Sequence, residues 1–287
     1  MSVHRWKAAC AAIVLMAGGA LPSLGAETVP LEKLSHIHGL AVDRQDPGRL
    51  LVATHHGLFA ASPDGTATTV SSLSHDFMGF TPHPAEPESY LGSGHPAAGG
   101  NLGVIRSSDG GRTWTKISNG HLGPVDFHAM TVSKADPQVM YGLYGRIQMT
   151  RDGGRTWMQM GSLPAKPFAL AASAKAADRV YAATEGGLLI SEDGGNSWSA
   201  ANADTRPVTS VHISRDGKVN AYVVGLGMVT GVEPVPRWHV VGLPATRYLA
   251  HLTADESNPS RLFAVDDTGG IVASADGGAT WRAFAAR

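Results

Sequence analysis

Four copies of one eight-residue pattern recur along the chain: SSDGGRTW at 107–114, TRDGGRTW at 150–157, SEDGGNSW at 191–198 and SADGGATW at 274–281. Their aspartates are 43, 41 and 83 residues apart, so the last gap spans two periods. Weaker copies stand at 230–238, in the middle of that gap, and at 62–65. Repetition at a fixed period of about 42 residues indicates one supersecondary unit repeated in space. The spacing predicts six units over residues 36–287.

Each unit begins with an apolar segment of strand length, and most of these segments end at a turn rich in Asp and Pro. Four short strands in about 42 residues are the pattern of a propeller blade. We therefore predict an all-β fold, a six-bladed β-propeller forming one domain over residues 27–287, with a seven-bladed ring as the alternative. Residues 28–34 are a candidate strand for closing the ring against the last blade. The innermost strands are predicted at 36–42, 76–82, 126–133, 168–173, 208–214 and 248–253.

The composition agrees with a turn-rich fold around an apolar core. The 287 residues include 35 Gly and 17 Pro, and 43% of them are hydrophobic. Only 16% are charged, and the formal net charge is −1. Binding to a phosphate backbone by counterion release needs clustered Lys and Arg. We therefore expect no nucleic-acid partner.

The first 26 residues have the layout of a secretory signal peptide. Arg5 and Lys7 precede an apolar run at 8–21, which is followed by a tail ending in Leu-Gly-Ala at 24–26. The run is too short to favour a membrane span, so we expect none in the mature protein. Cleavage after Ala26 would remove the only cysteine, Cys10. The sequence thus predicts a periplasmic or secreted protein without a thiol.

The repeated pattern resembles the Asp-box, or BNR repeat, of sialidases, sortilin-type receptors and photosystem II assembly factors. The whole mature chain also resembles a group of exported bacterial proteins named as glycosyl hydrolases. That likeness is carried by HIHGLAVD (36–43), ATHHGLF (53–59), HDFMGFTPHP (75–84), SGHPAAGGNLGVI (93–105) and GPVDFHAM (123–130). The resemblance implies a propeller whose repeated aspartates hold hairpin turns together, and it leaves the activity open because a fold does not fix a function.

Histidines gather in the first three units. Nine of the twelve that would remain after cleavage lie between residues 36 and 128. In a propeller, the starts of the innermost strands and the loops between second and third strands open on one face. Aligning the strand starts places His36, Asp76 and Asp126 in one column. Two residues further on, His38, Met78 and His128 form a second column.

Imidazole, thioether and carboxylate groups at one channel mouth predict a transition-metal site. Copper is the favoured ion, especially Cu(I) with Met78, whereas imidazole with carboxylate equally suits zinc or Cu(II). Two alternatives stay open: histidines that only hydrogen-bond their own loops, and general acid–base chemistry by His38 or His128. The predicted metal residues are His36, His38, Met78, His128, His55, His56, His75, Asp76, His95, His121 and Asp126.

Two further functions follow from the resemblances. Sialidases carry Arg-Ile-Pro at the start of the first blade, where this chain has His36-Ile37-His38. Glycoside hydrolysis also needs two carboxylates, and Asp76 with Asp126 is the pair that the predicted mouth offers. The photosystem II assembly factors use the same repeat as a non-catalytic platform, which implies a periplasmic protein partner. Their arginine-rich patch is missing here, because the arginines of this chain are dispersed.

Overall fold

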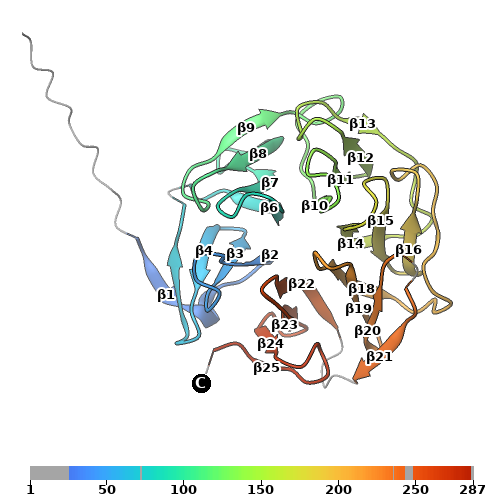
Figure 1. The fold of residues 1–287 in the computed structure, drawn as a ribbon. Helices are drawn as coiled ribbons and strands as arrows, with labels where there is room; N and C mark the ends of the chain where they lie inside the picture. The colour runs from blue at the N-terminus through green and yellow to red at the C-terminus, as the bar shows by residue number, and fades with distance from the viewer. Residues whose placement is uncertain (1–25, 72, 235, 243–247, 286–287) are drawn as a thin grey trace, which may run out of the picture.

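The computed structural model describes residues 26–71, 73–234, 236–242 and 248–285, which form a ring of antiparallel β-sheets around a central channel (Figure 1). There are six sheets in this part of the chain, and in each blade four consecutive strands run from the channel outward. The predicted six-bladed β-propeller is therefore confirmed. The proposed signal peptide lies outside the described residues, apart from Ala26.

The strands of each blade follow one another along the chain. The first three blades contain β2 (Ile37–Val42), β3 (Leu50–Thr54), β4 (Gly57–Ala61) and β5 (Thr66–Thr69); β6 (Asp76–Pro82), β7 (Tyr90–His95), β8 (Val104–Ser107) and β9 (Thr115–Ser118); and β10 (Ala129–Val132), β11 (Met140–Tyr144), β12 (Arg146–Thr150) and β13 (Met158–Gln159). The last three contain β14 (Pro167–Ala172), β15 (Val180–Thr184), β16 (Gly187–Ser191) and β17 (Ser199–Ala200); β18 (Val208–Ile213), β19 (Lys218–Val223), β20 (Gly227–Val232) and β21 (His239–Gly242); and β22 (Leu249–Asp255), β23 (Asn258–Asp266), β24 (Ile271–Ser274) and β25 (Arg282–Ala283).

The innermost strands fall close to their predicted ranges, with one shortened start. β10 begins at Ala129, three residues after the predicted start at 126. The cause is local, because the backbone N–H of Phe127 donates to the Ser93 hydroxyl of the second blade at 2.9 Å. Asp126 therefore sits in a loop anchored to the neighbouring blade.

The N-terminal segment does not pair with the last blade, so that prediction is wrong. β1 (Thr28–Pro30) pairs with β5 and adds a fifth strand to the outer edge of the first blade. It leads into η1, a single 3-10 turn at Leu31–Lys33. Leu31 and Leu34 pack against the apolar cluster shared by the first and last blades. The ring is therefore closed by apolar packing between complete blades, and the segment contributes side chains there.

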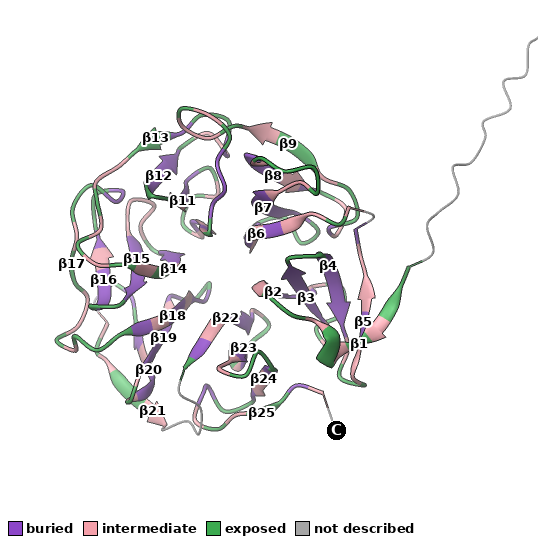
Figure 2. Cartoon of the chain, turned by 180° about the vertical axis from the view of Figure 1, so that it is seen from behind, coloured by how far each residue is buried: buried purple, intermediate pink, exposed green. Residues whose placement is uncertain are grey.

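Six apolar clusters fill the six interfaces between neighbouring blades. In the cluster between the second and third blades, Phe127 and Trp157 meet with ring centroids 4.9 Å apart. Figure 2 shows that buried residues concentrate in the middle strands, whereas the outermost strands are more exposed. In the described part of the chain, no helix is long and apolar enough to cross a membrane.

The four repeated DGG turns are stabilised by their own side chains. In the third blade, Asp152 accepts hydrogen bonds from the backbone N–H groups of Arg155 and Thr156, both at 2.9 Å, and from the Thr156 hydroxyl at 2.6 Å. Thr150 donates to the same carboxylate at 2.7 Å, and Trp157 donates to the Gly154 carbonyl at 2.9 Å. These aspartates satisfy hairpin donors and are not gathered at the channel.

The turn geometry yields a matched stability prediction. The weaker copy at 62–65 has Asp64, which accepts hydrogen bonds only from the backbone and hydroxyl of Thr66 within the described contacts. We expect Asp152→Ala to lower the free energy of unfolding by about 2 kcal/mol, because several donors lose a charged acceptor. Asp64→Ala should cost clearly less, because fewer donors lose their acceptor. Urea unfolding followed by tryptophan fluorescence measures both, and equal losses would contradict the assignment.

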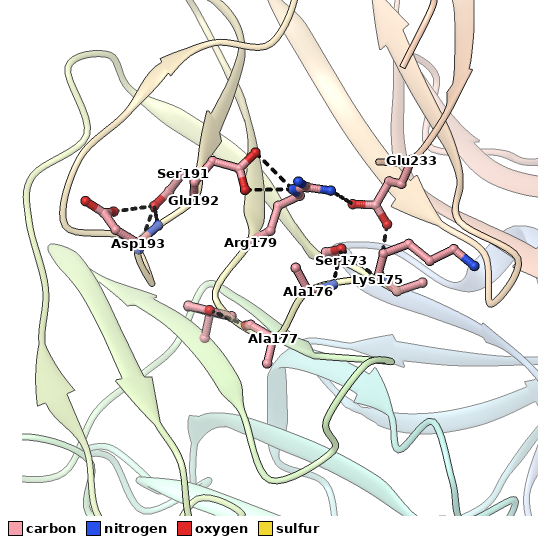
Figure 3. A network of polar contacts seen from close by, with 12 residues as sticks. Ser173, Lys175, Ala176, Ala177, Arg179, Ser191, Glu192, Asp193 and Glu233 are labelled. Atoms are coloured by element: carbon pink, nitrogen blue, oxygen red, sulfur yellow. Dashed lines mark hydrogen bonds and ion pairs between the residues drawn. The ribbon is translucent and has the colours of Figure 1, made fainter. Parts of the chain in front are cut away.

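The fifth blade replaces its DGG turn with a different contact. Glu233 stands near the place of the missing aspartate and is only 4% exposed. Its carboxylate accepts the backbone N–H of Ala174 at 2.9 Å and lies 3.5 Å from the Arg179 guanidinium, which also pairs with Glu192 at 2.8 Å (Figure 3). This network joins the turn after β14 in the fourth blade to the turn after β20 in the fifth.

Candidate functional site

The starts of the innermost strands of blades 1 to 3 meet the loops between second and third strands at one mouth of the channel. His38 lies on β2, and His55 occupies the two-residue turn between β3 and β4. Asp76 begins β6, and His95 ends β7. The propeller geometry thus brings together residues that are up to 57 positions apart in the sequence.

One metal-capable group joins the first two blades. Ligand atoms of His38, His55 and Asp76 all lie within 4.8 Å of one another. His55 Nδ1 is 2.8 Å from one carboxylate oxygen of Asp76, and His38 Nε2 is 3.4 Å from the other. The Asp76 side chain is 11% exposed and that of His38 is 23% exposed, whereas His55 is on the surface. The group is thus half-buried and open on one side.

These spacings match a small coordination shell. Zinc bonds to imidazole nitrogen and carboxylate oxygen are about 2.0–2.2 Å long, which places tetrahedral ligands about 3.3 Å apart. The atoms His38 Nε2 and Asp76 Oδ1 are buried and have no hydrogen bond to any described residue. Two buried polar atoms that face each other without a hydrogen bond are costly unless a proton or cation lies between them.

A second histidine group surrounds Asp126 between the second and third blades. His95 Nε2 is 3.0 Å and His128 Nε2 is 2.9 Å from the same carboxylate oxygen. Asp126 is only 3% exposed, and its other oxygen is buried without a hydrogen-bond partner in the described structure. The two imidazoles are much more exposed, so solvent reaches the group from their side.

The ring of His95 is oriented by a contact on the side away from Asp126. Its Nδ1 lies 2.8 Å from the Gly100 carbonyl, a contact that requires a proton on Nδ1. Nε2 then faces Asp126 either as a second protonated nitrogen or with a free lone pair. A backbone carbonyl that holds the far nitrogen of an imidazole is the usual outer contact of a metal-binding histidine. The arrangement therefore suits a cation, whether a proton or a metal ion.

The two groups share one contact, which is repeated one blade further on, and differ in their second imidazole: His38 comes from the blade before Asp76, whereas His128 comes from the same blade as Asp126. The loop histidine of one blade reaches the aspartate that begins the next blade, as His55 reaches Asp76 and His95 reaches Asp126. The copies also touch, because Asp76 and His95 are cross-strand partners in β6 and β7. The mouth therefore carries one continuous belt of imidazoles and carboxylates over three blades.

Burial and the carboxylates act in opposite directions on these histidines. Burial lowers the pKa of His38 below its ordinary value, and nearby Asp76 only partly offsets this. The lowered pKa favours the neutral imidazole, which is the form that binds a metal. The Gly100 carbonyl and, more weakly, Asp126 raise the pKa of His95. The belt thus contains one imidazole that resists protonation and one that favours it.

The other predicted residues lie around the belt or point elsewhere. His36 is exposed, with its ring 5.9 Å from that of His55, and the ring of His56 also adjoins His55 at 5.2 Å. His75 packs beside Phe77, with ring centroids 6.1 Å apart. His121 points towards the third blade, where its Nδ1 lies 3.3 Å from the Trp157 carbonyl. Met78 is half-buried on β6, and its role as a ligand stays a prediction.

His251 reaches the mouth although the sequence alignment passed over it. The β22–β23 pairing shifts register between Ala250 and Thr253. At this irregularity His251 adopts a positive φ of 51° and lines the channel beside His38. Burial, followed by the neighbouring His38, lowers its pKa to about 4. A histidine near the start of an innermost strand was the only available sequence signal.

Behind the belt, the channel encloses a cavity of about 810 Å³. His38, His128 and His251 line one end, and Arg44, Lys134 and Glu256 line the other. Between them the wall is largely apolar, with Leu40, Leu170, Val211 and Leu252 contributing from four of the six blades.

Comparisons with solved structures find the fold in proteins of different functions. The GH74 xyloglucanase of Xanthomonas campestris aligns with 90% of this chain at 18% identity and a TM-score of 0.57, and a GH74 enzyme of Niastella koreensis with 87% at 14% identity and a TM-score of 0.61. The aligned region covers 46% and 45% of those chains, so this chain spans less than half of their length.

A second kind of structural neighbour is YCF48 bound to D1 peptide, which aligns with 92% of this chain and 87% of its own at 16% identity and a TM-score of 0.55. No known family model matches the sequence. No curated protein matches it either. At identities this low the alignments show a common fold alone, shared with GH74 enzymes and with YCF48.

Proposed function

We propose that this protein binds a transition-metal ion at the mouth of its channel, through His38, His55 and Asp76. The observation that carries the proposal is the approach of three ligand atoms from two blades to within 4.8 Å of one another. The lowered pKa of His38 supports it, because a neutral imidazole offers its lone pair to a metal. An exported protein would take up this ion outside the cytoplasm.

Copper remains the favoured ion, with zinc as the alternative. Two imidazoles and one carboxylate form a donor set that suits Cu(II) or zinc. Cu(I) would also be bound by the thioether of Met78, which lies two residues after Asp76 on the same strand. Comparing Cu(I), Cu(II) and zinc affinities in wild type and Met78→Leu separates these cases, because the substitution should weaken Cu(I) binding alone.

The adjoining group around Asp126 belongs to the same proposal. It has the same residue types, a carboxylate with two imidazoles, and the Gly100 carbonyl orients His95 in the manner of a metal ligand. We expect this group to hold a second, weaker ion, because its two imidazole nitrogens share a single carboxylate oxygen.

The test is equilibrium dialysis of purified protein against Cu(II) or zinc, followed by elemental analysis. Wild type should retain about one tightly bound equivalent per chain. His55→Ala should weaken that binding by more than about 100-fold, beyond the 10–100-fold loss typical of an outer contact. Since His55 is exposed, the substitution should leave the fold intact.

His239→Ala is the matched control, because His239 is an exposed histidine on the outermost strand of the fifth blade. It should bind metal as wild type does. Retention of less than about a tenth of an equivalent by wild type, or equal binding by His55→Ala and wild type, would rule the proposal out.

A protein-binding platform is a second candidate, favoured by the exposed apolar side chains Leu122, Tyr144, Phe168 and Tyr248. Phe168 and Tyr248 border the same channel as the histidines. The structural neighbour YCF48 was solved with a bound peptide and aligns over most of its length. A pull-down with wild type and Phe168→Ser from periplasmic extract tests this candidate, which predicts a stoichiometric partner that the variant loses.

Glycoside hydrolysis is the weaker enzyme alternative. The carboxylates that it would use, Asp76 and Asp126, are each engaged by two imidazoles. Turnover of a fluorogenic sialoside or hexoside that Asp126→Asn abolishes would support this reading. The hydrogen bonds within the DGG turns support our further proposal that they are Asp-boxes with a structural role.

A further inference from the structure

The end of the channel opposite the histidines is surrounded by several charged residues. In the turn after an innermost strand, one backbone N–H donates a hydrogen bond that closes the turn, as those of Asp43, Ser133 and Ser214 do. The next residue along the chain has an equivalent position in every blade. In chain order the six blades contribute Arg44, Pro84, Lys134, Ala174, Arg215 and Glu256. The alternate blades 1, 3 and 5 thus supply three cations around the channel, against one carboxylate.

The neighbouring carboxylates are already engaged. Asp43 pairs with Arg49 at 2.6 Å, and Asp255 pairs with Arg261 at 3.2 Å. Glu233 is held by Arg179 and the Ala174 backbone, as Figure 3 shows. The negative charges of these three carboxylates are therefore largely neutralised by their own arginine partners. At this end of the described channel, the three cations have a net excess of two positive charges over Glu256.

The cations themselves are weakly paired. Lys134 Nζ lies 3.8 Å from Glu256, a distance too long for a hydrogen bond, and its side chain is 18% exposed. Glu256 also accepts the backbone N–H of Arg215 at 3.1 Å. Arg44 donates to the carbonyls of His83 and Glu86, which carry no charge. Burial lowers the pKa values of Lys134 and Arg44, Glu256 partly offsets this, and repulsion from Arg215 adds to it. An added anion would relieve both effects.

The cavity that leads to these cations is largely apolar, with Thr131, Thr209, Thr253 and His212 as polar groups in its wall. Leu40, Leu170, Val211 and Leu252 line its wall, and its volume of about 810 Å³ is in the range of small-molecule sites. A free phosphate ion would neutralise the cations but leave this wall in contact with water. An apolar molecule without a charge would fill the wall but leave the cations weakly paired. The surfaces together match a ligand that has an anionic head and an apolar body.

We propose that the channel binds a small amphipathic anion, a carboxylate or sulfonate on an alkyl or aryl body, with its head at Arg44, Lys134 and Arg215. The body lies along the apolar wall and points towards the histidine mouth. This site is separate from the proposed metal group, which occupies the other end of the channel. Binding at one end does not require the other.

Calorimetric titration of the full mature chain with decanoate, below its micelle concentration, tests the proposal. Metal is first removed with a chelator, followed by dialysis, so that the carboxylate cannot bind an ion at the mouth. Decanoate should bind, decanol should bind at least about tenfold more weakly, and inorganic phosphate should bind weakly or not at all. From hexanoate to octanoate to decanoate, affinity should rise by up to about tenfold per step as apolar area is buried.

Variants locate the head group. Lys134→Met should weaken decanoate binding by about tenfold or more, because a charged partner is lost while the length of the side chain is kept. Arg215→Gln, at an exposed position where folding is not at risk, should weaken it severalfold. Lys116→Met, on the exposed outer strand β9, is the matched control and should bind as wild type does.

His55→Ala should keep its decanoate affinity, so that failure of the metal proposal and failure of this one are distinguishable. The proposal is overturned if decanoate does not bind, if decanol or phosphate binds as tightly as decanoate, or if both Lys134→Met and Arg215→Gln leave its affinity unchanged.

Discussion

Replacing Gly94 by alanine should unfold the second blade at lower denaturant and abolish metal binding at Asp76. Gly94 has a φ of 120°, and a Cβ built there would lie 1.9 Å from the Asp76 carbonyl oxygen. The backbone of Gly94 pairs with Phe77 between β6 and β7, so it cannot shift to relieve the overlap without breaking that pairing. Strain in such a conformation costs about 1–3 kcal/mol, and the overlap adds to it. We expect a loss of about 4 kcal/mol in the free energy of unfolding.

Gly99→Ala is the control for this substitution. Gly99 also has a positive φ, of 86°, but a Cβ there meets nothing within 4 Å. It should therefore cost only about 1 kcal/mol and leave metal binding unchanged. Urea unfolding gives the free energies, and dialysis against Cu(II) gives the metal content. If Gly94→Ala were as stable as Gly99→Ala, the close packing of β6 against β7 described above would be wrong.

Acidification should destabilise the propeller through the histidines inside its channel. Burial lowers the pKa of His212 to about 3, and nearby Lys134 contributes in the same direction. The pKa of His251 is lowered to about 4. In the unfolded chain both should titrate near 6.5. Below pH 6.5 the unfolded state therefore binds more protons than the folded state, and stability falls until the pH reaches the folded pKa values.

The expected size of this effect is about 1–2 kcal/mol per histidine between pH 6.5 and 5, with allowance for water in the channel. Urea unfolding at pH 7.5 and pH 5.0 should show a total loss of about 3 kcal/mol for wild type. His212→Leu removes one of the two groups and should lose correspondingly less stability over the same range. An unchanged pH dependence in this variant would show that His212 has the same pKa in the folded and unfolded states, which would contradict the prediction.

The repeat was sufficient to predict the fold, because each unit encodes its own turn chemistry. In every DGG turn the donors and acceptors lie within six residues of one another, as Asp152, Thr150 and Thr156 illustrate. Such local hydrogen bonds are specified by the sequence of the turn itself. The number of blades, the positions of the inner strands and the placement of His38 and Asp76 on them could all be predicted from this period.

The pairing of the site residues could not be predicted in the same way. The sequence alignment grouped residues of one column, such as His38 with His128, whereas the structure pairs His55 with Asp76 and His95 with Asp126 across blade boundaries. Loop length and blade rotation determine these contacts, and neither follows from strand periodicity. His251 entered the channel through a register shift that leaves no mark in the sequence.

By itself, then, the sequence determined a six-bladed ring with histidines concentrated in three blades, because repeats and composition are local properties. Only the tertiary structure decided that β1 adds a fifth strand to the first blade and that two carboxylates each contact two imidazoles. It also decided that Arg44, Lys134 and Arg215 line the far end of a largely apolar channel. These contacts join residues that are tens to more than a hundred positions apart, and their distances depend on how six separately encoded blades pack against one another.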